Sequence, residues 1–390
     1  MASFFETEQV AVRCVLMRGG TSKALFFHER DVPPSGPARD RLLKRAMGTP
    51  DVLQIDGMGG SRLVTSKVAI IQRSARGDAD IDYTFAQVDV DRDSVGYDAN
   101  CGNISSAVAP FAIDEGLVEA VEPVTTVRIY NTNTDKLMVS KVQVKNGKAR
   151  VQGDCAIPGV PGTGAEILMD YAGTVGAKTG RLLPTGQAMD TVTLEDGRSI
   201  EVSLCDTANP CVFIAAASLG MSGSELPDAI SADRALIETL GEIQSKMGER
   251  IGLYADWRQV HLPGLPLAVI VAPPADYVDV NGETQDAVSM DLRARLVFLG
   301  KCHDSMAGTG SMCTAAASRL PGSTVHQAVG TERAATGTLR IGHPLGVMEV
   351  KVVAEPAANP ADIRFSALGL TRTARRLMAG EVYVPVEVNP

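Results

Sequence analysis

Cys101 stands in the segment DANCGNISSAV, immediately before Gly102 and Asn103, at the predicted start of a short apolar helix. Free backbone N–H groups and the positive end of the helix dipole at such a position bind carboxylate oxygens and favour a thiolate. One interpretation is therefore an acid/base thiol beside an anion site that also includes Asn100. The alternative is a small buried side chain ahead of a glycine turn, because free cysteine is often simply part of a core. The residues alone leave both open.

The second half of the chain contains a similar segment, MAGTGSMC at 306–313. Gly308, Thr309 and Gly310 open another short apolar helix there, again with free amide donors. Two such helix starts that face one cleft would grip two carboxylates. A tight glycine turn that needs a positive φ accounts for the same residues equally well.

The segment MRGGTSK at 17–23 follows a predicted strand and combines glycines and hydroxyls with flanking cations. Arg18, Gly20, Thr21 and Ser22 are therefore candidates for a third anion-binding turn.

Two isolated polar side chains are further candidates. Lys67 lies in the strand TSKVAIIQ, where desolvation would lower the pKa of the lysine and allow it to act as a base. The alternative is a solvated lysine on an outer face. Asn209, in the turn TANPC, stands just before a strand; its amide either meets a substrate carboxylate or makes an ordinary Asn-Pro turn.

No metal or cofactor is expected. Five histidines and seven cysteines include neither a CxxC nor an HxxxH pair, so a structural zinc site is improbable, and Cys211, Cys302, His303 and Cys313 are expected to be structural. The P-loop pattern is absent, and DGMGGSR at 56–62 lacks the last glycine of a dinucleotide fingerprint. No GxSxG or HExxH motif supports a hydrolase.

The composition excludes several classes of partner. A net charge of -9 and a pI of about 5.2 would repel phosphate backbones and anionic lipid, so neither nucleic acid nor a membrane surface is expected as a partner. The chain shows neither a secretion signal nor an apolar run of roughly 18 residues. We expect free thiols and a cytoplasmic protein.

Alternating apolar patterns predict many antiparallel strands, at 10–17, 65–72, 80–90, 124–133, 136–144, 295–300 and 347–355. Amphipathic helices are predicted at 37–48, and at 231–248 between Ser231 and Gly248. The segments 102–113 and 310–320 are apolar nearly all round, which is typical of buried helices.

One buried helix in each half indicates a weak internal duplication of a sheet wrapped around a central helix. The loop-rich stretch 155–190 is the expected crossing between the halves. We predict a first domain at 1–184, with its central helix near 102–114 and a return of the C-terminal strand near 380–390, and a second domain at 185–390, with its central helix near 310–320.

Seven motifs together are specific: MRGGTSK, DGMGGSRLVTSK, NCGNISSAVAPFA, RIYNTNT, ANPC, AGTGSMCTAAA and IGHPLG. The sequence resembles the PrpF family, which includes 2-methylaconitate cis-trans isomerase, 3-methylitaconate isomerase and 4-oxalomesaconate tautomerase. The resemblance runs from residue 17 to the segment IRFSALGLTRTARRLM. It implies the α+β diaminopimelate-epimerase fold, with two similar domains, each a mostly antiparallel sheet rolled around a central buried helix, and an active site between them.

The resemblance also implies roles for individual residues. Epimerases of this fold use two cysteines, one before GN and one before GTG, and here Ala307 takes the second position. The PrpF family instead uses a lysine with a cysteine, and the matching positions are Lys67 and Cys101. The implied enzyme is a cofactor-independent isomerase without a bound metal.

The expected reaction is a 1,3-allylic proton shift in an unsaturated di- or tricarboxylate. A proton that lies α to a carboxylate and allylic to a C=C bond is acidic only when the resulting dienolate is stabilised by hydrogen-bond donors. The expected donors are Arg18, Gly20, Thr21, Ser22, Asn100, Gly102, Asn103, Asn209, Gly308, Thr309 and Gly310. The first expectation for the substrate is a 4-oxalomesaconate-type acid, and 2-methylaconitate and 3-methylitaconate are the alternatives. Leu345, where relatives often have serine, would alter one carboxylate contact. An alternative of another functional class is a non-catalytic accessory protein that binds a polycarboxylate. A homodimer is a possible assembly for the enzyme and for the accessory protein.

Overall fold

The computed structural model describes residues 8–355 and 357–386. In the first half, the strands are β1 (Gln9–Gly19), β2 (Ser22–His28), β3 (Lys67–Arg73), β4 (Ile81–Val88), β5 (Val95–Gly96), β6 (Val124–Asn131), β7 (Lys136–Lys145), β8 (Lys148–Ala149) and β9 (Ile167–Asp170). The helices of this half are α1 (Pro37–Met47) and α2 (Gly102–Asp114).

The second half has the strands β10 (Asp190–Thr193), β11 (Ser199–Thr207), β12 (Asn209–Ala215), β13 (Leu267–Ala272), β14 (Tyr277–Val278), β15 (Thr284–Gln285), β16 (Leu292–Phe298), β17 (Lys301–Cys302), β18 (Thr338–His343), β19 (Gly346–Glu355), β20 (Arg364–Arg372) and β21 (Ala374–Pro385). Its helices are α3 (Pro227–Ala232), α4 (Arg234–Arg250), α5 (Gly308–Ala317), α6 (Thr324–Val329) and α7 (Thr331–Ala334).

The same succession of strand pairings occurs in both halves. β1 pairs antiparallel with β2, β2 parallel with β3, β3 antiparallel with β4, β4 parallel with β6, and β6 antiparallel with β7. β11, β12, β13, β16, β18 and β19 repeat this order and these directions. A short strand, β5 or β17, precedes the central helix each time. The topology therefore carries the duplication that the sequence indicated.

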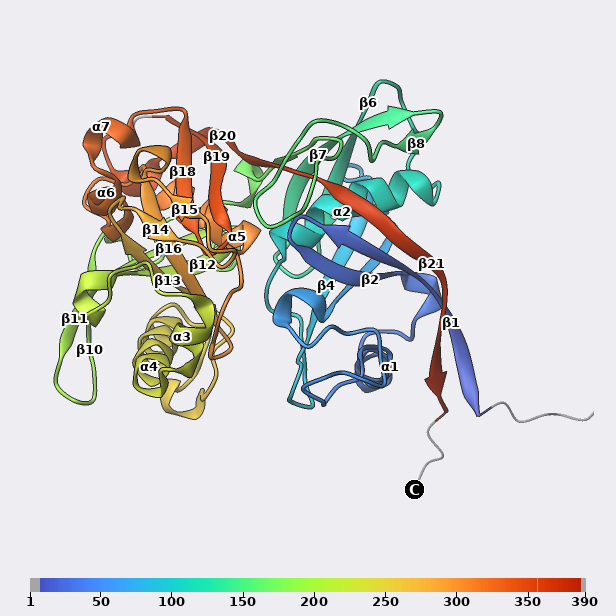
Figure 1. The fold of residues 1–390 in the computed structure, drawn as a ribbon, viewed down its shortest axis with the longest axis horizontal. Coiled ribbons are helices and arrows are strands. Elements are labelled where there is room, and N and C mark those ends of the chain that lie inside the picture. The colour runs from blue at the N-terminus through green and yellow to red at the C-terminus, as the bar shows by residue number, and fades with distance from the viewer. Residues whose placement is uncertain (1–7, 356, 387–390) are drawn as a thin grey trace, which may run out of the picture.

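Figure 1 shows the two halves as two lobes, with β21 (red) running back across the first lobe beside β1. β21 pairs antiparallel with β1 along its length, from Gln9 opposite Pro385 to Gly19 opposite Ala374. β9 pairs with both β7 and β20, which joins the strands of the two halves. The predicted return of the C-terminal strand reaches beyond this pairing, because residues 387–390 lie outside the described part. The domain division at residue 184 stays a prediction.

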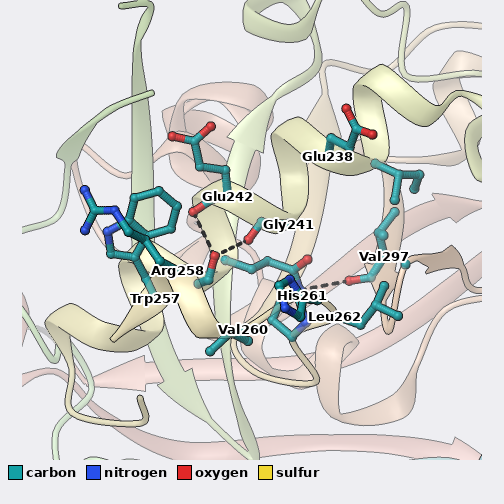
Figure 2. A pocket seen from close by; sticks show the side chains of 14 residues that line it. Glu238, Gly241, Glu242, Trp257, Arg258, Val260, His261, Leu262 and Val297 are labelled. Carbon is teal, nitrogen blue, oxygen red and sulfur yellow. Dashed lines mark hydrogen bonds between the residues drawn. The ribbon is translucent and has the colours of Figure 1, made fainter. Parts of the chain in front are cut away.

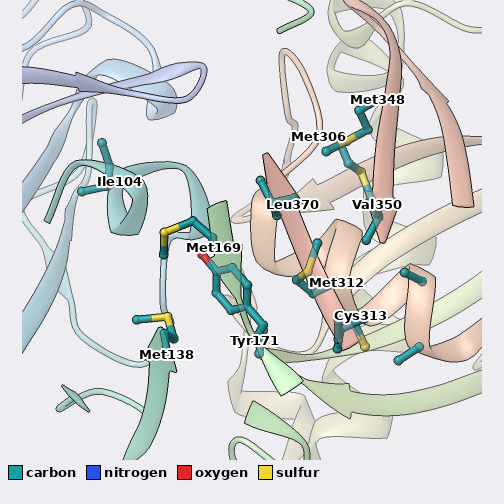
Figure 3. Packing of buried hydrophobic residues seen from close by; sticks show 14 of the residues in the cluster. Ile104, Met138, Met169, Tyr171, Met306, Met312, Cys313, Met348, Val350 and Leu370 are labelled. Carbon is teal, nitrogen blue, oxygen red and sulfur yellow. The ribbon is translucent and has the colours of Figure 1, made fainter. Parts of the chain in front are cut away.

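The central helices α2 and α5 are buried because they have no polar face. Every residue of α2 from Gly102 to Ile113 and every residue of α5 is buried. One apolar core includes both helices, and Figure 3 shows part of it, with Ile104 and Tyr171 from the first half and Met312 and Leu370 from the second.

The structure confirms helix α1 and corrects the second amphipathic helix. Ser231 lies inside the short α3, and α4 begins instead at Arg234, because the side chain of Asp233 caps it by accepting a hydrogen bond from the backbone N–H of Leu236. α4 also continues past Gly248 to Arg250. Within residues 8–355 and 357–386, no helix has both the length and the apolar character needed to cross a bilayer.

Candidate active site

The N-terminal ends of α2 and α5 touch one another. A Cβ atom added to Gly102 would lie 2.8 Å from the backbone carbon of Gly308 and from the backbone nitrogen of Thr309. Only glycine allows this approach, which accounts for both glycines without a contact to substrate. Because each helix start carries a partial positive charge, their meeting point is favourable for anions.

A cavity of about 260 Å³ lies beside this junction. Five residues predicted from the sequence line it together, although they come from four separate segments: Lys67, Asn100, Cys101, Asn209 and Thr309. The rest of the lining includes Gln87 and His303 and the apolar side chains of Phe85, Leu262, Leu265, Leu267, Phe298 and Leu299. The cavity thus combines titratable groups with a largely apolar wall.

Lys67, the first residue of β3, is 3% exposed. Its Nζ donates a hydrogen bond to Oε1 of Gln87 at 2.5 Å, and Gln87 is its direct partner on β4. Nε2 of Gln87 donates to the backbone carbonyls of Leu63, Ser66 and Val88. These three contacts fix the amide so that its oxygen faces Lys67, which holds the amine in place.

Burial lowers the pKa of Lys67, and the nearby Cys101 thiol opposes this shift. The amine is therefore more easily deprotonated than a solvated lysine, as a base requires. Cys101 is half-buried at the N-cap position of α2, and its backbone carbonyl accepts a hydrogen bond from the N–H of Ser105 at 2.8 Å. Lys67 and Cys101 thus line one cavity as an unlike pair.

His303 is the main residue of the cavity that the sequence did not indicate as functional. It is 4% exposed, and burial together with Lys67 lowers its pKa to about 3. Its Nδ1 accepts a hydrogen bond from the backbone N–H of Ser305 at 3.0 Å. Since a neutral imidazole carries one proton, that proton is on Nε2, which is a donor. The sequence predicted a structural role for His303, because the segment CHDS at 302–305 carries no motif spacing.

Asn209 organises the segment before Cys101. Its Oδ1 accepts from the backbone N–H of Asn100 at 3.1 Å, and its Nδ2 donates to the carbonyl of Asn100 at 2.9 Å and to Oγ1 of Thr309 at 3.0 Å. The amide therefore connects the two halves at the cavity. The side-chain oxygen of Asn100 is also occupied, since it accepts from Ser105 and Asn131.

The segment MRGGTSK does not reach this cavity. Arg18, Thr21 and Ser22 line a different cavity of about 460 Å³. Arg18 donates to the backbone carbonyls of Gly20 and Thr373 and to Oγ1 of Thr373, which holds its guanidinium against the residue that links β20 and β21. The predicted third anion-binding turn thus lies apart from the cavity of Lys67, and its role in substrate binding stays a prediction.

Asn103, Gly20 and Gly310 also turn away from the cavity of Lys67. Nδ2 of Asn103 donates to Oγ1 of Thr21 at 3.1 Å, and its Oδ1 accepts from Nε of Arg372 at 3.1 Å. Gly20, with a φ of 51°, packs against Asn103, where a Cβ would lie 2.3 Å from Oδ1. A Cβ on Gly310 would lie 2.3 Å from a methyl carbon of Leu296. These contacts explain the two glycines by close packing and engage both polar side-chain atoms of Asn103, and a substrate contact of the three residues stays a prediction.

A further hollow of about 330 Å³ lies between α4 and the segment from Trp257 to Pro263. Figure 2 shows Val260 and Leu262 of this segment among the residues that line it. Both residues also line the cavity of Lys67, so this segment is the wall between the hollow and that cavity.

Within the described part of the chain, no group of three or more His, Cys, Asp or Glu side chains is placed to hold a metal ion.

Comparison with known proteins identifies close relatives along nearly the full length. The family model described as PrpF protein matches residues 9–385. The chain is 45% identical to the 3-methylitaconate isomerase of Eubacterium barkeri, over 97% of this chain and 98% of the relative. It is 38% identical to the 4-oxalomesaconate tautomerase of Pseudomonas putida, over 96% and 97%.

Solved structures support the same assignment. A crystal structure of methylitaconate-delta-isomerase matches with a TM-score of 0.77 and 45% identity, over 97% of each chain. A hydroxyproline epimerase from Agrobacterium vitis shares the fold alone, with a TM-score of 0.57 and 14% identity over 97% of this chain and 94% of the other. The predicted epimerase-like fold is thereby confirmed. By sequence and by structure the chain is a member of the PrpF family, and it is an isomerase.

Proposed function

We propose that this isomerase catalyses a 1,3-allylic proton shift in a small unsaturated dicarboxylate, with Lys67 and Cys101 as the proton-transferring pair. The observation that carries the proposal is the presence of a desolvated lysine and a thiol in one cavity, at the junction of two helix N-termini. A base and an acid at different places along an allyl system are what a double-bond migration requires.

In the proposed reaction, neutral Lys67 removes a proton from the carbon that lies next to a carboxylate and allylic to the double bond. The electron pair moves into a dienolate. The thiol of Cys101 then returns a proton at the far end of the allyl system, and the double bond has migrated with no net oxidation or reduction. The opposite assignment of the two roles gives the reverse reaction.

The negative charge of the dienolate needs donors that are in place before the reaction. The free N–H groups at the starts of α2 and α5 are suited to a carboxylate, and Nε2–H of His303 is a neutral donor in the same cavity. Because His303 is uncharged, it can stabilise developing charge without competing with Lys67 for the proton.

For the substrate we propose a methyl-substituted dicarboxylate of the methylitaconate type, ahead of the oxalomesaconate type favoured by the sequence motifs. The apolar wall around Phe85, Leu265 and Phe298 suits a methyl group better than a further carboxylate. The higher identity to the relative named 3-methylitaconate isomerase supports the same order.

Incubation with each candidate acid in D2O, followed by proton NMR, tests the proposal. We expect isomer formation with deuterium incorporated at the carbon that receives the proton. Binding of the acids without isomer formation or deuterium incorporation would contradict the proposal and favour an accessory role.

A further inference from the structure

The catalytic cavity contains few charged groups. Among the described residues that line it, the acidic or basic side chains are Lys67, His303 and Asp98. His303 is neutral near pH 7, because its pKa is about 3. Lys67 must also be neutral when it acts as a base. The carboxylate of Asp98 is therefore a fixed negative charge in a cavity whose proposed ligand is itself an anion.

Asp98 stands where this cavity meets the solvent. The residue is exposed, and of the described residues it alone lines both the catalytic cavity and a neighbouring polar hollow of about 480 Å³. Because the catalytic cavity measures only about 260 Å³, a ligand that fills it comes close to every group of the lining. The outer end of such a ligand therefore approaches the carboxylate of Asp98.

The charge of Asp98 is not neutralised by a direct contact. Its carboxylate forms neither a hydrogen bond nor an ion pair with a described residue. Lys178 attracts it only from a distance, across the neighbouring hollow. Burial raises the pKa of Tyr254 in the opposite wall of the cavity, and the charge of Asp98 raises it further. The field of this carboxylate thus extends across the cavity.

A substrate with two carboxylates and one with three meet this cavity differently. The N-terminal ends of α2 and α5 are two positive features that match two carboxylates. A third carboxylate would have to face the apolar wall around Phe85 and Phe298, where an unpaired charge is costly, or the opening beside Asp98. Two like charges a few Å apart near a protein surface weaken binding by about 3- to 10-fold.

We propose that Asp98 is a specificity-determining residue, which makes the cavity favour dicarboxylates over tricarboxylates. This role rests on the proposed function, because it requires the substrate to bind in the cavity of Lys67 and Cys101. Of the candidate acids, 3-methylitaconate carries two carboxylates, whereas 2-methylaconitate and 4-oxalomesaconate carry three. Asp98 acts by repelling the tricarboxylate and needs no contact with the dicarboxylate.

Isothermal titration calorimetry at constant ionic strength tests this role with two saturated analogues that cannot be isomerised. These probes are 2,3-dimethylsuccinate, a dicarboxylate, and tricarballylate, a tricarboxylate. In Asp98→Asn, tricarballylate should bind about 3- to 10-fold more tightly than in the wild type, and Asp98→Lys should increase this gain. The affinity for 2,3-dimethylsuccinate should change by less than about twofold in Asp98→Asn.

Asp93→Asn is the matched control. It removes the same charge from an exposed carboxylate that pairs with Lys44 outside the cavity, so both affinities should equal those of the wild type. A gain for tricarballylate that also occurs in Asp93→Asn would show an effect of net charge alone and would overturn the proposal. An equal change for both probes in Asp98→Asn, or no binding of either probe to the wild type, would overturn it as well.

Turnover separates this role from the proposed function. We expect Asp98→Asn to raise kcat/KM for 2-methylaconitate relative to 3-methylitaconate by about 3- to 10-fold. Isomerisation with an unchanged ratio would overturn the role of Asp98 and leave the proposed function intact. The expected selectivity in binding, without isomerisation of any of the acids, would contradict the proposed function and still support the role of Asp98.

Discussion

Nδ1 of His303 accepts a hydrogen bond from the backbone N–H of Ser305 at 3.0 Å, which leaves Nε2–H as the free donor of a neutral imidazole that lines the same cavity as Lys67 and Cys101. The tautomer follows from local backbone geometry, and the absence of charge follows from burial. The residue is thereby suited to donate a hydrogen bond to a developing anion and unsuited to exchange protons near neutral pH.

Replacement of His303 by Phe should lower turnover by about 10²- to 10³-fold, because a donor to the dienolate is lost. His303→Gln, which keeps an N–H donor, should retain more activity. If His303 is a neutral donor, its titration should not affect kcat/KM of the wild type near pH 6.5. A rise or fall of kcat/KM near pH 6.5 that is present in the wild type and lost in the His303 variants would contradict this role. His343→Phe is the control, because His343 has the same contact, with Nδ1 accepting the N–H of Leu345 at 3.2 Å, outside the cavity lining.

Lys67→Met and Cys101→Ser should each reduce turnover by about 10²- to 10⁴-fold while the proteins stay folded. Solvent deuterium exchange into the substrate, followed by proton NMR, measures the loss. Cys155→Ser, which removes a half-buried thiol away from the cavity, is the control and should behave as the wild type. Near-wild-type exchange in either Lys67→Met or Cys101→Ser would refute the catalytic pair.

Gln87→Glu should act through Lys67. A carboxylate at the position of Oε1, 2.5 Å from Nζ, would stabilise the ammonium and raise the pKa of Lys67. If Lys67 is the base, the rise of kcat/KM with pH should then move to higher pH, whereas a purely structural change would leave the profile in place. Gln143→Glu, on β7, is the matched control and should leave the profile unchanged.

Acid should destabilise the fold through its buried histidines. Burial lowers the pKa of His303 and His343 from 6.5 to about 3, so between these values the unfolded chain binds protons that the folded chain does not. Stability is therefore lost as the pH falls below 6.5, by about 1.4 kcal/mol per pH unit for each histidine in the middle of this window. Denaturant unfolding of the wild type and His343→Gln between about pH 4 and pH 6 measures it. An unchanged slope in His343→Gln would be inconsistent with this assignment.

Gly308→Ala should reduce the free energy of unfolding by about 1–3 kcal/mol, because its Cβ would lie 2.8 Å from the backbone carbon of Gly102. Activity should fall as well, since the helix starts that form the cavity would move apart. Gly241→Ala is the control: the glycine lies inside α4 with no atom within 4 Å of an added Cβ, and alanine there should stabilise by about 0.5–1 kcal/mol. Equal stability of Gly308→Ala and the wild type would show that the helices separate without cost.

Residue patterns were sufficient for much of the fold. The apolar character of GNISSAVAPFAI predicted that α2 is buried, and alternation predicted strands such as β3 and β7, because these patterns determine which faces must leave water. The boundaries of α4 were missed, since Ser231 and Asp233 are both good caps. Asp233 caps the helix, whereas the hydroxyl of Ser231 bonds to the carbonyl of Pro227 and to the N–H of Cys302.

The candidate site could be predicted only in part. The sequence by itself predicted Lys67 and Cys101 as the catalytic pair, from the family motifs, and showed that two helix starts are rich in glycine. Tertiary structure decided that Gln87 faces Lys67 and that His303 lines the same cavity as Lys67 and Cys101. It also decided that Arg18 lines a different cavity. The physical reason is that motifs specify local backbone conformation, whereas a shared cavity depends on strand register and on contacts between residues as far apart as Asn100 and Thr309.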